Sequence, residues 1–114
     1  MTWLGLDIGG ANLKVADGSG WARGVPFPFW REPGRLSAAL TELIASAPAA
    51  DRLAVTMTGE LCDCFRTKAE GVGHILAAVG QAAGAREVRI YLVDCQLVSM
   101  DEARSLPQLA AASN

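Results

Sequence analysis

The stretch WLGLDIGGANLKVAD, residues 3–17, decides the fold, because it describes two short strands joined through a pair of glycines. Residues 3–8 form an apolar run of strand length that is interrupted only by Asp7. Residues 12–16 alternate polar and apolar side chains, which is the period of a strand with two different faces. Because Gly9-Gly10 lies between these runs, we expect a tight β-hairpin.

The same hairpin carries a possible phosphate site. Glycine has no side chain, so a bulky anion can lie against the backbone at Gly9-Gly10 and meet several N–H groups. Asp7 could hold a hydrated Mg²⁺ beside such an anion, and Lys14 could supply a balancing positive charge. An ordinary hairpin with a polar turn explains these residues equally well.

Length and composition indicate one globular domain. The chain has 114 residues, of which 51% are hydrophobic, enough to bury a core without disulfides or metals. Its net charge is −2 and no basic cluster is present, so we expect no nucleic-acid partner. No apolar stretch approaches the roughly twenty residues of a membrane span, and no export signal precedes the first strand. We therefore expect a cytoplasmic protein without a membrane partner.

The rest of the chain predicts alternating helices and strands. Trp21 begins a third strand. Because proline cannot donate to a ladder, Pro26 and Pro28 predict that this strand lies at a sheet edge or stops near Val25. Hydrophobic spacing then predicts a helix between residues 34 and 47, a strand at 53–57, a helix at 68–83, a strand at 88–93 and a brief helix between residues 99 and 107.

This order of elements predicts an α/β fold with a mixed five-stranded sheet in the order 3-2-1-4-5 and helices on both faces. Strands 1, 4 and 5 are then parallel, and their carboxyl ends share one edge, where ligands bind in open α/β sheets. The polar or glycine residues at these ends come from three separate segments: Asp7, Gly9 and Gly10; Thr58, Gly59 and Glu60; and Asp94. Their convergence predicts a binding site.

Other reactive residues have simpler explanations. Cys62, Cys64 and Cys95 with Asp63 could bind zinc, but the Cys-x-Cys spacing is tighter than usual, so we favour free thiols. His74 is expected on a helix surface. Glu60 and Asp63 could do acid–base chemistry or could belong to a solvated loop.

Three segments carry a family resemblance. LGLDIGGANLK (residues 4–14), PFPFW (26–30) and VTMTGELCDCF (55–65) resemble the hydantoinase/oxoprolinase-like proteins linked to tetrahydromethanopterin-dependent C1 transfer. The resemblance implies a ribonuclease H-like half-domain of the actin-like ATPase superfamily. Archaeal members of the family act in methanofuran biosynthesis, where they join an aminomethylfuran diphosphate to γ-glutamyltyramine with loss of pyrophosphate.

The resemblance implies roles for eight residues. Asp7, Gly9, Gly10, Asn12 and Lys14 would form the first phosphate-facing turn, and Thr58, Gly59 and Glu60 a substrate-facing loop. Asp7 and Glu60 would be catalytic, and Asp7 would also position Mg²⁺ with a phosphate, diphosphate or nucleotide. The implied function is that of a transferase acting on a small phosphorylated molecule of C1-carrier metabolism.

Family members are much longer and have a second half that completes the ligand cleft. We therefore expect residues 1–107 to form the N-terminal domain, residues 108–114 to begin an absent second half, and the chain to be inactive alone. Two alternatives stay open. The chain could be a non-catalytic module that forms a homodimer or pairs with a partner through the face left open, or a fragment of a generic actin-like sugar or acid kinase.

Overall fold

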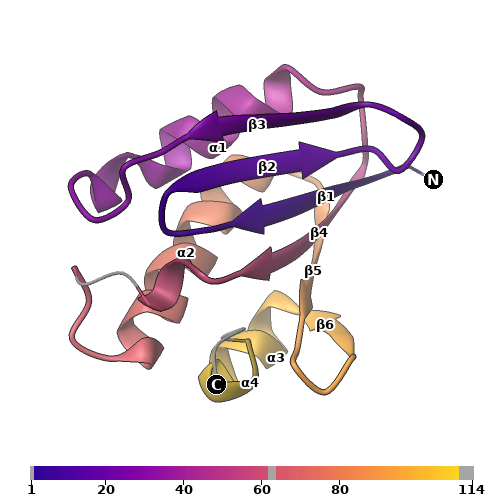
Figure 1. Cartoon of the computed structure of the whole chain (residues 1–114). Coiled ribbons are helices and arrows are strands. Elements are labelled where there is room, and N and C mark those ends of the chain that lie inside the picture. Colours follow the sequence, from indigo (N-terminus) through magenta and orange to yellow (C-terminus); the bar gives the residue numbers. More distant parts are fainter. Residues whose placement is uncertain (1, 62–63, 111–114) are drawn as a thin grey trace.

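The computed structural model describes residues 2–61 and 64–110. These residues form a six-stranded mixed sheet with helices packed against it (Figure 1). The strands are β1 (Trp3–Ile8), β2 (Asn12–Ala16), β3 (Ala22–Pro26), β4 (Arg52–Met57), β5 (Glu87–Tyr91) and β6 (Leu97–Ser99). The helices are η1 (Pro33–Arg35), α1 (Leu36–Ala45), η2 (Gly59–Leu61), α2 (Lys68–Ala83), α3 (Met100–Ser105) and α4 (Pro107–Ala110), of which η1 and η2 are 3₁₀ turns.

The strand order is β3-β2-β1-β4-β5-β6. The predicted order of the first five strands is therefore confirmed, with β3 at the edge. β1 pairs with β2 in antiparallel fashion, with Asp7 opposite Lys14, and with β4 in parallel, with Asp7 beside Thr56. β4 and β5 are also parallel. The hairpin and both parallel pairs place the carboxyl ends of β1 and β4 side by side.

The prediction of five strands was wrong, because β6 pairs with β5 as an antiparallel edge strand. The chain turns back after β5, where the Leu92 N–H donates to the Gln96 carbonyl over 2.8 Å. β6 contains only three residues, and its last residue, Ser99, is also the N-cap of α3. A strand this short carries too little alternation to be distinguished from the start of a helix.

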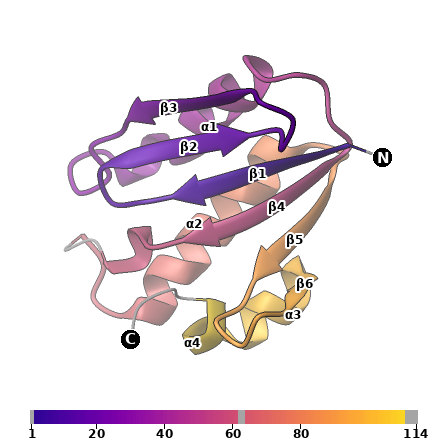
Figure 2. The same cartoon turned by 45° about the vertical axis from the view of Figure 1, so that its right-hand side comes forward.

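The prediction of helices on both faces was also wrong. Figures 1 and 2 show α1 and α2 on the same side of the sheet. The crossover from β3 to β4 through α1 and the crossover from β4 to β5 through α2 both move in the same direction along the sheet. Two right-handed crossovers in one direction place their helices on one face. α3 and α4 also pack against α2.

The core lies between the sheet and these helices. Leu4, Leu6 and Ile8 of β1 are buried, whereas Gly5 between them is exposed and Asp7 is half-buried. The same alternation holds in β2 and β4. The sheet therefore has one covered face and one open face, which carries the alternate residues. Within the described ranges, no helix is long and apolar enough to cross a membrane.

The ends of α2 and α3 carry residues typical of helix caps. Thr67 caps α2 by accepting a hydrogen bond from the Glu70 N–H, and Ser99 caps α3 by accepting one from the Glu102 N–H. Gly84 ends α2 with a φ of 61°. α3 ends before Pro107 as predicted, but Pro107 then begins α4, because proline suits the first position of a helix.

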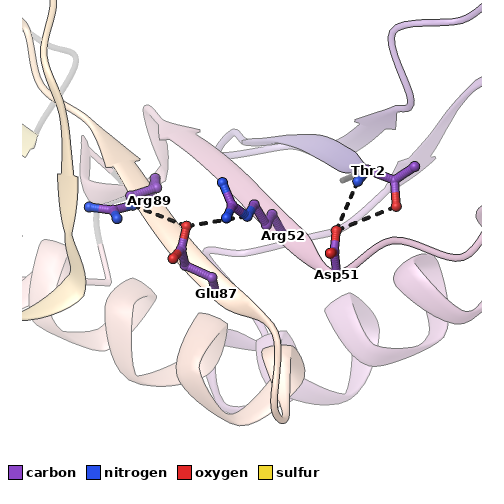
Figure 3. A network of polar contacts seen from close by, with 5 residues as sticks. All are labelled: Thr2, Asp51, Arg52, Glu87 and Arg89. Atoms are coloured by element: carbon purple, nitrogen blue, oxygen red, sulfur yellow. Dashed lines mark hydrogen bonds and ion pairs between the residues drawn. The ribbon is translucent and has the colours of Figure 1, made fainter.

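A polar network joins the starts of β1, β4 and β5 (Figure 3). The Asp51 carboxylate accepts hydrogen bonds from the N–H and the hydroxyl of Thr2, at 2.9 and 3.4 Å. Glu87 pairs with Arg52 of β4 at 3.6 Å and with Arg89 of β5 at 3.3 Å. These contacts lie at the opposite end of the strands from the Gly9-Gly10 turn.

Candidate functional site

The turn after β1 lies directly against the end of β4. The Thr58 N–H donates to the Ile8 carbonyl over 2.9 Å, which extends the parallel pairing past the end of β4. A Cβ atom placed on Gly9 would lie 3.6 Å from the Thr58 Oγ1. The prediction that Gly9 and Thr58 meet at one edge is therefore confirmed.

The two glycines of the turn differ in their surroundings. The Gly9 N–H donates to the Asn12 carbonyl over 3.0 Å, and a Cβ on Gly9 would lie only 3.2 Å from that oxygen. A Cβ on Gly10 would meet no atom within 4 Å, and Gly10 does not adopt a positive φ. Among the described residues, the N–H groups of Gly10 and Ala11 have no acceptor. The free donors of the turn are thus at residues 10 and 11, and neither packing nor backbone conformation requires glycine at residue 10.

Asp7 and Lys14 lie next to this turn on the open face. They are cross-strand partners, and Thr56 is the neighbour of Asp7 on its other side. The stem of Lys14 lies over Gly24 of β3, where a Cβ would be 3.7 Å from the Lys14 Cγ. Neither Asp7 nor Lys14 makes a side-chain hydrogen bond or ion pair within residues 2–61 and 64–110. A carboxylate and an ammonium group are therefore both free to contact a ligand.

Gly59 has a packing role. A Cβ at this position would lie 2.9 Å from the Phe29 Cε2 and 3.4 Å from the Gly9 carbonyl oxygen. The Phe29 ring is fully buried and cannot retreat into solvent. Glycine at residue 59 therefore allows the loop after β4 to close over Phe29, whether or not a ligand binds.

Glu60 turns toward α2. Its side chain is only 2% exposed, and its Cα lies 2.8 Å from where a Cβ on Gly71 would stand. Glu60 is also not among the residues that line the open face next to Asp7. Asn12, the remaining predicted site residue, is exposed and contributes its carbonyl oxygen to the turn.

Aromatic residues from three separate segments of the chain pack together beneath this loop. Phe29 makes edge-on contacts with Phe27 and Phe65, at ring-centre distances of 5.7 and 5.5 Å. His74 lies 5.3 Å from Phe65, and its Nε2 donates to the Pro33 carbonyl over 2.7 Å. The expected surface position of His74 was wrong, because this half-buried side chain joins α2 to η1. Its partner lies 41 residues away in the sequence, so no local signal could have revealed it.

Asp94 does not join the other predicted residues. It is exposed in the turn between β5 and β6, and no hydrogen bond within the described chain connects it to Gly9 or Thr58. The reason is that β5 ends at Tyr91 and the chain then folds back, away from the shared edge. The predicted convergence therefore holds for two segments and fails for the third.

The cysteines show no metal centre among the residues that the structure describes. No group of three histidine, cysteine or acidic side chains could hold a metal ion there. Cys62 and Asp63, part of the possible zinc site, lie outside the described residues. Cys95 is exposed, and its thiol accepts a hydrogen bond of 3.5 Å from the Tyr91 hydroxyl. That hydrogen bond is the main cause of a raised pKa at Tyr91.

Comparison with known proteins found a similar enzyme but no matching family model. The similar protein is the (4-{4-[2-(gamma-L-glutamylamino)ethyl]phenoxymethyl}furan-2-yl)methanamine synthase of Methanocaldococcus jannaschii, which is 33% identical over 114 residues. The matching region covers 97% of this chain and 33% of the synthase. The chain therefore spans about a third of the length of the curated relative that it matches.

Proposed function

We propose that this chain is the phosphate-binding N-terminal part of a transferase of C1-carrier metabolism, with an actin-like half-domain fold and a role in methanofuran synthesis. Similarity to the synthase over 97% of the chain supports the relation to this pathway. The structural observation that carries the proposal is the Gly9-Gly10 turn against Thr58, with Asp7 and Lys14 beside it.

The product named for the synthase gives a chemical reason for a phosphate site. It contains an ether between a phenol oxygen and a furanylmethyl carbon. Such an ether forms when the phenol oxygen attacks that carbon, the bond from the carbon to a leaving group breaks, and the phenol proton passes to a base. A diphosphate is a suitable leaving group, since it departs as pyrophosphate with the bonding electron pair. Its growing negative charge must be stabilised.

The residues of this edge suit that task. The N–H groups of Gly10 and Ala11 would donate to phosphate oxygens, and the Lys14 ammonium would pair with their charge. Asp7 fits a hydrated Mg²⁺, because it is a half-buried carboxylate without a protein partner in the described chain, and Mg²⁺ usually takes one or two carboxylates plus water. Bound Mg²⁺ would help to neutralise charge on the leaving group.

Glu60 stays a predicted catalytic residue. Its side chain is 2% exposed, so it could accept a proton from a substrate only after η2 moves. Thr58 and Gly59 would shape the wall of the site, since Thr58 is exposed beside Gly9 and Gly59 fixes the loop over Phe29.

A titration of the ¹⁵N-labelled chain with pyrophosphate and MgCl₂, followed by amide NMR spectra, tests this proposal. We expect the N–H signals of Gly10, Ala11 and Lys14 to shift and to saturate at about millimolar ligand, because solvent screens each contact in an open site. Asp7→Asn should weaken the Mg²⁺-dependent part of the binding. Asp101→Asn, which changes a 92% exposed carboxylate on α3, is the matched control.

Unchanged spectra, or shifts confined to other parts of the sheet, would contradict the proposal. A parallel titration with Mg²⁺-ATP separates it from the kinase alternative. If ATP shifts many more signals than pyrophosphate and binds more tightly, the site recognises a nucleoside and the chain belongs with the kinases.

A further inference from the structure

The segment 27–33, which follows β3, is fixed by a hydrogen bond at each of its ends. At its start, the Phe27 N–H donates to the Ala11 carbonyl of the β1–β2 turn over 2.8 Å. At its end, the Pro33 carbonyl accepts a hydrogen bond of 2.7 Å from the His74 Nε2 of α2. These two bonds connect the turn to a helix on the covered side of the sheet. We call residues 27–33 the bridging segment.

The middle of the bridging segment supports the loop after β4. The Phe29 ring is fully buried, and a Cβ on Gly59 would lie 2.9 Å from it and 3.4 Å from the Gly9 carbonyl oxygen. The position of the ring therefore sets how closely the loop approaches the turn. The Thr58 N–H, which donates to the Ile8 carbonyl over 2.9 Å, ties the same loop to the end of β1. A displacement of Phe29 would move the loop relative to the turn.

His74 holds the bridging segment in two ways. Its ring centre lies 6.1 Å from that of Phe29 and 5.3 Å from that of Phe65, and its Nε2 donates to Pro33. Ring contacts tolerate sliding, whereas a hydrogen bond fixes both distance and direction because it weakens steeply away from a linear geometry. Without this donor, the half-buried Pro33 carbonyl would favour a position in which water replaces the lost partner.

The contacts of His74 point to the candidate site and not to the sheet. Within the described chain, its hydrogen bond and ring contacts all reach residues that flank the loop after β4: Phe29, Pro33 and Phe65. None of these three residues belongs to a strand. The side chain is therefore placed to restrain one edge of the fold more than to stabilise its core.

We propose that His74 is a positioning residue, whose hydrogen bond to Pro33 holds the bridging segment so that Phe29 keeps the loop after β4 against the Gly9-Gly10 turn. His74 acts through Phe29 and does not itself touch the ligand. This inference rests on the proposed function for what the turn binds, and adds the device that fixes the geometry of the site.

Hydrogen exchange of the Thr58 amide in the ligand-free chain measures how firmly the loop is held. His74→Phe keeps an aromatic ring but removes the donor, so we expect the Thr58 N–H to exchange about fivefold faster, as for the loss of one hydrogen bond. His74→Gln keeps an N–H donor without the ring and should restore the native rate. His74→Leu also removes the donor and replaces His74→Phe if that variant does not fold.

Val79→Ala is the control, because it removes buried atoms from the same helix outside the aromatic cluster. It should accelerate exchange of the amides of β4 and β5, which open with the whole core, and leave Thr58 unchanged, since Thr58 exchanges through a local opening. His74→Phe should give the reverse pattern.

A titration with pyrophosphate and MgCl₂ then tests the consequence for binding. We expect His74→Phe to weaken pyrophosphate binding about fivefold, the size expected when one hydrogen bond to a charged ligand is lost or lengthened, and His74→Gln to restore it. Val79→Ala should bind as the native chain does.

The outcomes separate the two claims. Native exchange at Thr58 and native pyrophosphate affinity in His74→Phe would overturn the positioning role and leave the proposed function standing. The positioning role also fails if His74→Gln behaves like His74→Phe, or if Val79→Ala accelerates Thr58 as much as His74→Phe does. If the native chain does not bind pyrophosphate, the proposed function fails, and the Thr58 exchange rates still decide whether His74 positions the loop.

Discussion

Cys95 illustrates how single residues carry local strain in this fold. Its φ is 71°, and it is the only non-glycine residue with a positive φ in the described part of the chain. This conformation costs a residue with a Cβ about 1–2 kcal/mol, and glycine avoids that cost. We expect Cys95→Gly to stabilise the protein by about 0.5–1 kcal/mol, after the larger entropy of glycine in the unfolded chain is subtracted.

Urea unfolding measures this change, and Cys95→Ala is its control. Alanine also removes the thiol that Tyr91 contacts but keeps the strained backbone, so it should give no gain. If Cys95→Ala stabilises the protein as much as Cys95→Gly, loss of the thiol is the cause and the strain argument is wrong.

Asp51 gives a prediction for pH. The hydrogen bond from the Thr2 N–H is the largest cause that holds the pKa of Asp51 below its ordinary value of 3.8 (Figure 3). The folded chain therefore favours the charged form, which stabilises the protein above that value and ceases to do so as the pH falls through the lower folded-state pKa. The difference in urea midpoint between the native chain and Asp51→Asn should be constant between about pH 7 and 5 and should shrink below about pH 4. A difference that stays constant to about pH 3 would show that the carboxylate charge does not matter.

At the scale of elements, two glycines of α2 provide a matched pair. A Cβ on Gly71 would lie 2.8 Å from the Cα and 2.9 Å from the carbonyl oxygen of Glu60, whereas a Cβ on the exposed Gly73 would meet nothing within 4 Å. Alanine is favoured over glycine in a helix by about 1 kcal/mol. Gly73→Ala should therefore stabilise the protein by about that amount, while Gly71→Ala should destabilise it by about 1–3 kcal/mol because η2 must move.

Thermal and urea unfolding of the two variants test this contrast. Equal stabilisation by both substitutions would mean that η2 yields without cost and that α2 does not hold the loop after β4 in place. In that case the close packing of Glu60 on α2 would not restrain the site.

The sequence predicted those elements whose pattern is local. The β1–β2 hairpin follows from the alternation around Gly9-Gly10, and the edge position of β3 follows from Pro26. β6 was missed because three residues carry little pattern. The single covered face follows from the handedness and the common direction of both crossovers taken together.

The candidate site was predictable only in part, because some of its contacts follow from strand topology and others depend on tertiary packing. Gly9 meets Thr58 because parallel neighbouring strands end at one edge, which topology alone requires. The contacts of Gly59 with Phe29 and of His74 with Pro33 join distant segments through tertiary packing, so no spacing in the sequence indicates them. Asp94 was misplaced because the turn into β6 was not recognised.

At the scale of the whole molecule, the sheet and its covering helices form one core. The proposed phosphate site, in contrast, is bounded by described residues on one side and is open to solvent on the other. We expect the chain to unfold in a single cooperative transition. Adding about 0.1 mM Mg²⁺-pyrophosphate or Mg²⁺-ATP should leave the melting temperature unchanged, because a ligand far below its Kd contributes almost nothing to stability. A rise of many degrees at micromolar ligand would show that this edge binds tightly without a second wall.

The most direct test of the central claim is the activity of a hybrid in which this chain replaces the matching third of the M. jannaschii synthase. We expect the hybrid to form the synthase product and Asp7→Asn to reduce its kcat/KM by about 10²-fold or more without changing its melting temperature, since the substitution removes stabilisation of the leaving group. A cooperatively folded hybrid that forms no product, or that works equally well with Asp7→Asn, would contradict the assignment of this edge as the phosphate site.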